Sequence, residues 1–232
     1  MNLDLETAKY FTNVVIDNFE GGYYHPQMKQ YLKGGENMKD SGETMFGIDF
    51  KYGGSLGQSQ FAQEVHDYFA PYVNQVVDNA SAMKIYNDKA NGKKVCPASY
   101  GNKWRPMVAQ LMLNLFKQYF SYLSPGAQQM VLNDKALMLQ FWYAVWNGKA
   151  RFQKFAEIMN AAYNGGERNP QTINVLILNE RYKLPYNSTT KMDKITAEWY
   201  GKPNKTTKKR SVLPWLLVGG ALLFFIFKNK KS

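Results

Sequence analysis

The sequence predicts a mainly α protein with a small β-hairpin, followed by one C-terminal transmembrane helix. Three observations predict this fold class. Apolar residues recur at helical spacing through most of the chain, the alternation typical of strands is confined to residues 43–51, and residues 212–227 carry no charge. At 232 residues with 45% hydrophobic content, the chain can bury one core and carry an accessory segment.

The first helix is predicted to run from Leu5 to Glu20, where two glycines end it. Gly21 and Gly22 carry no side chains and can adopt positive φ, so the backbone can turn sharply beside the carboxyl group. Because Glu20 follows an aromatic residue near a helix C-terminus, we expect desolvation and the helix dipole to disfavour its charged form. A carboxyl group of this kind suits a general acid.

The remaining elements follow from periodicity and from turn residues. Alternation and flanking glycines allow a hairpin at residues 43–51, residues 59–77 predict an amphipathic helix broken at Pro71, and residues 87–105 predict a polar loop. Ser124 is expected to cap a helix that has Pro125 at its first position. Further helices are predicted at residues 80–86, 107–123, 127–132, 137–146, 150–163 and 173–182.

Two motifs resemble those of the lysozyme-like N-acetylmuramidases of phages and bacteria, of the glycoside hydrolase family 108 type. The first is Glu20-Gly21-Gly22-Tyr23 followed by Asp40-x-Gly42-x-Thr44-x-x-Gly47-Ile48, with Ser41 where the family usually has glycine. The second runs from Gln140 to Gly148, with Trp142 where the family has aspartate. The resemblance implies a lysozyme-like peptidoglycan-degrading domain over residues 1–200, in which Glu20 protonates the glycosidic oxygen as the glutamate of hen-type lysozyme does.

The second catalytic or positioning role has three candidates, Asp40, Glu43 and Thr44. If Asp40 or Glu43 faces the sugar opposite Glu20, it can position water or stabilise the cation, and the reaction is hydrolysis. If neither does, Glu20 acts alone and a hydroxyl of the sugar closes an anhydro product, as in lytic transglycosylases. Asp40 fits a capping or turn role before Gly42 at least as well, and Glu43 is expected to be exposed.

Sugar rings stack on aromatic side chains, and their hydroxyls bind amides and hydroxyls. The candidate substrate-binding residues lie beside the two motifs, and they are Tyr23, Tyr24, Tyr143, Trp146 and Asn147. Trp142 is expected to belong to the core instead.

Composition excludes several classes of protein. Cys96 is the single cysteine, so an intramolecular disulfide framework is excluded, and with only His25 and His66 we expect no metal and no cofactor. Eight basic residues and no acidic residue lie in residues 201–232, which leaves +3 of the net charge of +11 for residues 1–200. We therefore expect no nucleic-acid partner.

Residues 212–227 are apolar on every side and are flanked by lysine and arginine at both ends. As a helix they would span about 24 Å, which suffices for a membrane when flanking lysines extend to the headgroups. We therefore predict a flexible basic linker at residues 201–211, a single-pass transmembrane helix at residues 212–227 and a basic tail at residues 228–232.

No signal peptide is recognised at the start of the chain, so we expect the body to face the cytoplasm. The expected location is the internal membrane of a lipid-containing phage or the inner membrane of its host, for use in wall penetration or in lysis. Peptidoglycan and the lipid bilayer are the expected partners, with other virion membrane or capsid proteins as further candidates. The alternative is a catalytically inactive lysozyme-like viral membrane protein with a structural or glycan-binding role.

Overall fold

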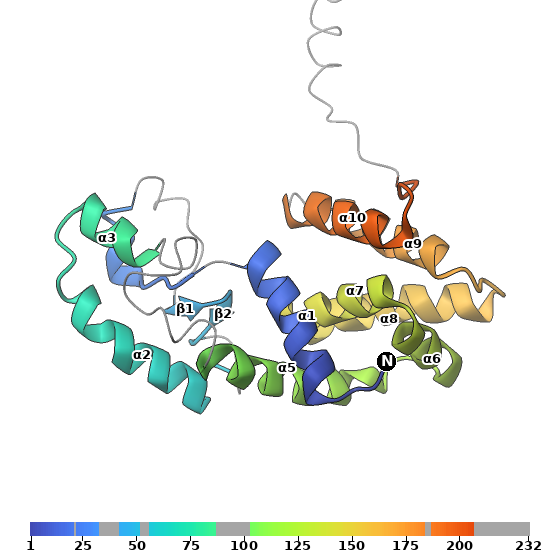
Figure 1. Ribbon diagram of the computed structural model, residues 1–232, viewed down its shortest axis with the longest axis horizontal. Coiled ribbons are helices and arrows are strands. Elements are labelled where there is room, and N and C mark those ends of the chain that lie inside the picture. The colour runs from blue at the N-terminus through green and yellow to red at the C-terminus, as the bar shows by residue number, and fades with distance from the viewer. Residues whose placement is uncertain (21, 33–41, 52–55, 87–102, 184–186, 207–232) are drawn as a thin grey trace, which may run out of the picture.

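The computed structural model describes residues 1–20, 22–32, 42–51, 56–86, 103–183 and 187–206 (Figure 1). Over these residues the protein is mainly helical and has a small antiparallel sheet, as the sequence predicts. The elements in chain order are α1 (Leu5–Asn18), the 3-10 helix η1 (Pro26–Met28), β1 (Thr44–Met45), β2 (Ile48–Asp49), α2 (Gln60–Val73), α3 (Asn79–Tyr86), α5 (Trp104–Phe120), α6 (Pro125–Asn133), α7 (Lys135–Trp146), α8 (Lys149–Asn164), α9 (Pro170–Tyr182) and α10 (Asn187–Tyr200).

Helix α7 forms the centre of the core. Every residue from Ala136 to Val145 is buried, including Trp142, because α1, α5, α6, α8, α9 and α10 all contact this helix. A helix surrounded in this way has no solvent face, which explains why its sequence is apolar almost without interruption.

Helices α1 and α5 pack against each other and connect the two ends of the molecule. In Figure 1, α2, α3 and the hairpin lie at one end of this pair, and α6 to α10 lie at the other. The C-terminal end of α1 therefore points to the region between the hairpin and the larger helical group.

Several helix starts follow the capping rules. Asp4, Ser59, Asp134 and Asn169 each accept a hydrogen bond from a backbone N–H of the first turn. Ser124 occupies the predicted N-cap before Pro125, but its hydroxyl makes no capping hydrogen bond.

Three predictions about helices require correction. Pro71 does not break α2. It lies in the last turn, and because the helix ends at Val73, little of the helix follows the proline. Helix α5 begins at Trp104, inside the segment predicted as a loop, while residues 87–102 lie outside the described residues. Helix α10 was not predicted at all.

Strands β1 and β2 form a hairpin joined by a two-residue turn, with Met45 opposite Ile48. Phe46 and Gly47 both have positive φ, 54° and 74°, as the tight turns that suit strand twist require. Tyr24 adds an isolated bridge to Thr44, so the segment after α1 pairs with the hairpin. Positive φ is uncommon for a bulky side chain, and the burial of Phe46 holds it there.

No helix within the described ranges combines the length and apolar character needed to cross a membrane. The predicted transmembrane helix at residues 212–227, the basic tail and residues 207–211 of the linker lie outside these ranges.

Candidate active site

Glu20 lies directly after α1. The helix ends at Asn18 and Phe19 is its C-cap, so Glu20 is not in the last turn as predicted, although its N–H still contacts the carbonyl of Val15 at 3.3 Å. The residue is half-buried. Its carboxyl group is thus held near the negative end of the α1 dipole, as the sequence indicates.

The hairpin turn packs directly against the Glu20 carboxyl group. A Cβ added at Gly47 would overlap the Oε2 atom of Glu20 and would lie 2.6 Å from its Cδ atom. Only glycine leaves room for this approach, and the φ of 74° also favours glycine here. The structure therefore brings together two residues of the first motif that lie 27 positions apart in the sequence.

The second motif holds the same turn from the other side. The indole N–H of Trp146, at the end of α7, donates a hydrogen bond to the carbonyl oxygen of Phe46 at 2.8 Å. Because Phe46 has positive φ and is fully buried, this bond fixes a conformation that the residue alone would not favour. Trp146 thus holds the turn, and Asn147 donates to the carbonyl of Tyr143 at 2.8 Å and is itself exposed.

Tyr143 is the residue of α7 that interacts with the candidate acid. Burial, the negative charge of Glu20 and a hydrogen bond with Glu20 together raise the pKa of Tyr143 to about 12. The phenol therefore stays protonated at neutral pH and can donate to the carboxylate. Its ring stacks on Phe19 with centroids 4.7 Å apart, and its exposed fraction is only 6%.

Two buried polar residues behind Tyr143 were missed by the sequence analysis. The guanidinium of Arg181 lies 4.9 Å from the centre of the Tyr143 ring and donates to Oε1 of Gln140 at 2.7 Å. Burial lowers the pKa of Arg181 to about 9, so the group remains charged at neutral pH. Its position in line with Ile173 and Ile177 on the apolar face of α9 was a signal that the arginine is buried.

Glu43 is not exposed, contrary to the prediction. One of its oxygens accepts a hydrogen bond from the Tyr23 hydroxyl at 2.6 Å, the other lies 2.7 Å from Nδ1 of His66, and its side chain is only 11% exposed. Tyr23 in turn stacks on Phe69 with centroids 3.7 Å apart. These contacts connect the Glu20–Tyr23 motif and the hairpin to α2.

The pKa values of this cluster reflect its contacts. The hydrogen bond that His66 donates to Glu43 and the negative charge of Glu43 raise the pKa of His66, whereas burial lowers the pKa of the neighbouring His25. Burial and the hydrogen bond with Glu43 raise the pKa of Tyr23 well above its ordinary value. Glu43 therefore acts in this structure as a link between the hairpin and α2.

Three of the remaining candidates are placed as follows. Tyr24 is buried with 3% exposure and Thr44 with 6%, and their backbones exchange two hydrogen bonds at 2.8 and 2.9 Å. Like the fully buried Tyr23, they form the frame behind the site instead of facing solvent. Asp40 lies outside the described residues. Among the described residues, no group of three or more His, Cys, Asp or Glu side chains is placed to hold a metal ion.

Comparison with known proteins gives no relative. No family model matches the chain, and neither the curated proteins nor the solved structures contain a significant match.

Proposed function

We propose that this protein is a membrane-anchored glycosidase that cleaves the glycan strands of peptidoglycan, with Glu20 as its general acid. One observation carries the proposal most strongly. The half-buried carboxyl group of Glu20 lies against Gly47 of the hairpin and beside the hydroxyl of Tyr143. Both motifs of the lysozyme-like resemblance thus converge on a single acid, which is the arrangement expected of a glycosidase.

In the proposed reaction, Glu20 donates its proton to the glycosidic oxygen between two amino sugars as the bond to C1 breaks. Positive charge then develops at C1 and on the ring oxygen. Tyr143 orients the carboxyl group, and the positive charge of Arg181 behind it stabilises the carboxylate that remains after proton transfer. The hydrogen bond from Trp146 to Phe46 keeps the turn in place against the acid.

Glu43 is assigned a positioning role in this proposal, because both of its oxygens already have hydrogen-bond partners. The second catalytic role then belongs either to Asp40 or to no carboxylate. With Asp40, water attacks C1 and the product has a reducing end. Without a second carboxylate, a hydroxyl of the same sugar attacks C1 and the product is an anhydro sugar.

The test is digestion of purified peptidoglycan by the wild type and by two variants. Glu20→Gln is expected to abolish cleavage, because the amide has no proton to donate to the leaving oxygen. Glu157→Gln, which changes an exposed carboxylate of α8, is expected to leave cleavage unchanged. Mass spectrometry of the fragments then identifies reducing or anhydro ends. Full activity of Glu20→Gln would refute the role of Glu20, and an inactive wild type that still binds the glycan would favour the non-catalytic alternative.

The location is the second part of the proposal and follows from residues 212–227. We propose that they anchor the body to a membrane, and that this membrane is carried in the particle of a lipid-containing phage. The full chain is expected to stay in the membrane fraction after an alkaline carbonate wash, and removal of residues 212–232 is expected to release it. Immunoblotting of purified particles before and after lipid extraction tests the virion assignment.

A further inference from the structure

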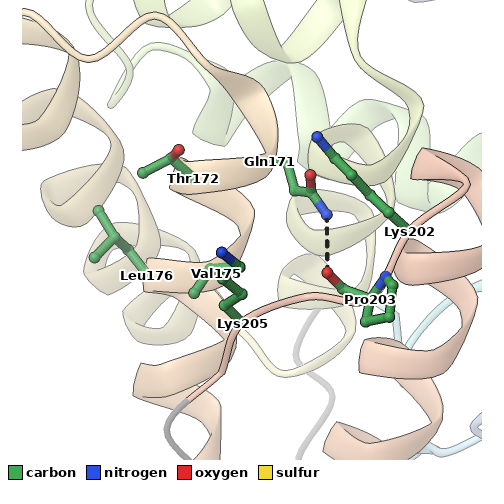
Figure 2. A pocket seen from close by; sticks show the side chains of 7 residues that line it. All are labelled: Gln171, Thr172, Val175, Leu176, Lys202, Pro203 and Lys205. Atoms are coloured by element: carbon green, nitrogen blue, oxygen red, sulfur yellow. Dashed lines mark hydrogen bonds between the residues drawn. The ribbon is translucent and has the colours of Figure 1, made fainter.

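A pocket of about 430 Å³ opens between the first half of α9 and the segment that follows α10 (Figure 2). Gln171, Thr172, Val175 and Leu176 line one side, and Lys202, Pro203 and Lys205 line the other. This volume lies within the range typical of small-ligand sites. The candidate active site uses the last turn of α9, through Arg181, so the pocket is a separate feature.

The wall formed by residues 202–205 is held in place by a polar network beneath it. The side-chain amide of Asn204 donates to the Oδ1 atom of Asp193 at 3.2 Å and to Oγ1 of Thr196 at 2.9 Å. Its Oδ1 atom accepts from Gln171 at 3.2 Å, and Gln171 also reaches the carbonyl of Pro203 (Figure 2). The wall is therefore a fixed part of the fold.

The lining combines apolar surface with positive charge. Leu176 is 42% exposed, and Val175 and Pro203 extend its apolar surface into the pocket. Lys202 and Lys205 are exposed, and among the described residues neither forms an ion pair with a carboxylate. Within the described part of the chain, no acidic residue lines the pocket. This combination is complementary to a ligand that has an apolar part and a negatively charged headgroup.

We propose that this pocket binds the headgroup region of an anionic phospholipid. The inference rests on the membrane anchor of the proposed function. Residue 212 follows Thr206 by only six positions, a distance of at most roughly 20 Å in an extended chain, so an anchored protein holds the pocket close to the bilayer surface. Lysines near a membrane surface attract anionic lipids, and Leu176 would contact the upper acyl chain.

The test is titration of the full chain, in neutral detergent, with short-chain phosphatidylglycerol, followed by thermal unfolding. The same titration is made with short-chain phosphatidylcholine, which has no net charge, and with glycerol 3-phosphate, which has no acyl chains. The comparison separates the contribution of the negative charge from that of the acyl chains. Phosphatidylglycerol is expected to raise the unfolding temperature, and the other two ligands are expected to have little effect.

The pocket variant is Lys202→Gln with Lys205→Gln, and we expect it to bind phosphatidylglycerol about tenfold or more weakly. The matched control, Lys84→Gln with Lys117→Gln, removes the same charge from the exposed surfaces of α3 and α5, away from the pocket lining, and is expected to keep wild-type affinity. Leu176→Ser changes an exposed side chain, so it should fold normally and weaken binding of the lipid.

Equal responses to both phospholipids would overturn the inference, and so would an equal loss of affinity in the control variant. A response to glycerol 3-phosphate as strong as to phosphatidylglycerol would indicate a phosphate site instead. Because the lipid is added in solution, binding does not require the anchor, so failure of the anchor would show only in membrane fractionation.

Discussion

Gly47→Ala provides the sharpest test of the contact between the hairpin and the candidate acid. The new Cβ would lie 2.6 Å from the Cδ atom of Glu20, and ordinary contact begins at 3.4 Å, so this atom would have to move by about 0.8 Å and the overlapped Oε2 atom by more. A misplacement of about 1 Å can cost roughly 10²-fold in rate. We therefore expect a loss of that order in glycan cleavage, measured with soluble peptidoglycan fragments.

The substitution also costs stability, because alanine at positive φ is unfavourable by about 1–2 kcal/mol. Gly166→Ala is the matched control, since Gly166 has a φ of 93° and a Cβ there would meet nothing within 4 Å. Both variants should unfold at temperatures lower by a few degrees. Only Gly47→Ala should lose activity. Equal activity in the two variants would refute the assignment of the Glu20–Gly47 contact to the active site.

Three further predictions concern residues around Glu20 and Glu43. Trp146→Phe removes the hydrogen bond to Phe46 and leaves a buried carbonyl without this donor, so urea unfolding should show a loss of about 1–3 kcal/mol. Tyr143→Phe keeps the stack on Phe19 but removes the hydroxyl beside Glu20, so the maximal rate of cleavage should fall roughly tenfold while KM stays near the wild-type value. The hydrogen bond to Glu43 raises the pKa of His66 above its ordinary value of 6.5. The paired imidazolium therefore stabilises the fold fully below pH 6.5, and this stabilisation is lost as the pH rises through the higher pKa of the folded state. The difference in unfolding free energy between wild type and His66→Gln should therefore shrink with increasing pH, and a difference independent of pH would contradict the pairing.

The helical part of the fold was predictable where burial follows the period of the helix. Helix α7 is the clearest example, because a run of apolar residues that includes Trp142 can only belong to a helix with no solvent face. Helix α10 could not be recognised in this way. Its buried face contains Thr189, Asp193 and Thr196 beside Met192, so its contacts with the core are largely polar hydrogen bonds that periodicity of apolar residues does not detect.

The sequence analysis named Glu20, the acid of the candidate site, but missed several of the contacts made by the residues around it. The resemblance joins the motif at Glu20 with the segment from Asp40 to Ile48, and the structure adds that Gly47 is the residue in contact with Glu20. The sequence could not show that Tyr23 points to Glu43 and away from solvent, because that depends on the stack against Phe69 from α2. Arg181 was missed for the same reason, since its role depends on Gln140 of another helix.

The fixed position of Asn204 determines where a tether to a membrane would begin. Ser188, whose hydrogen bond lowers the pKa of Tyr143, lies at the first turn of α10, whereas Asn204 follows its last turn. A helix of 14 residues is about 21 Å long, so the acid and the exit point of the chain are separated by a rigid rod of that length. In an anchored enzyme the acid would therefore lie about one length of α10 from the point where the tether begins, and lengthening the linker would extend the reach of the enzyme without altering this offset.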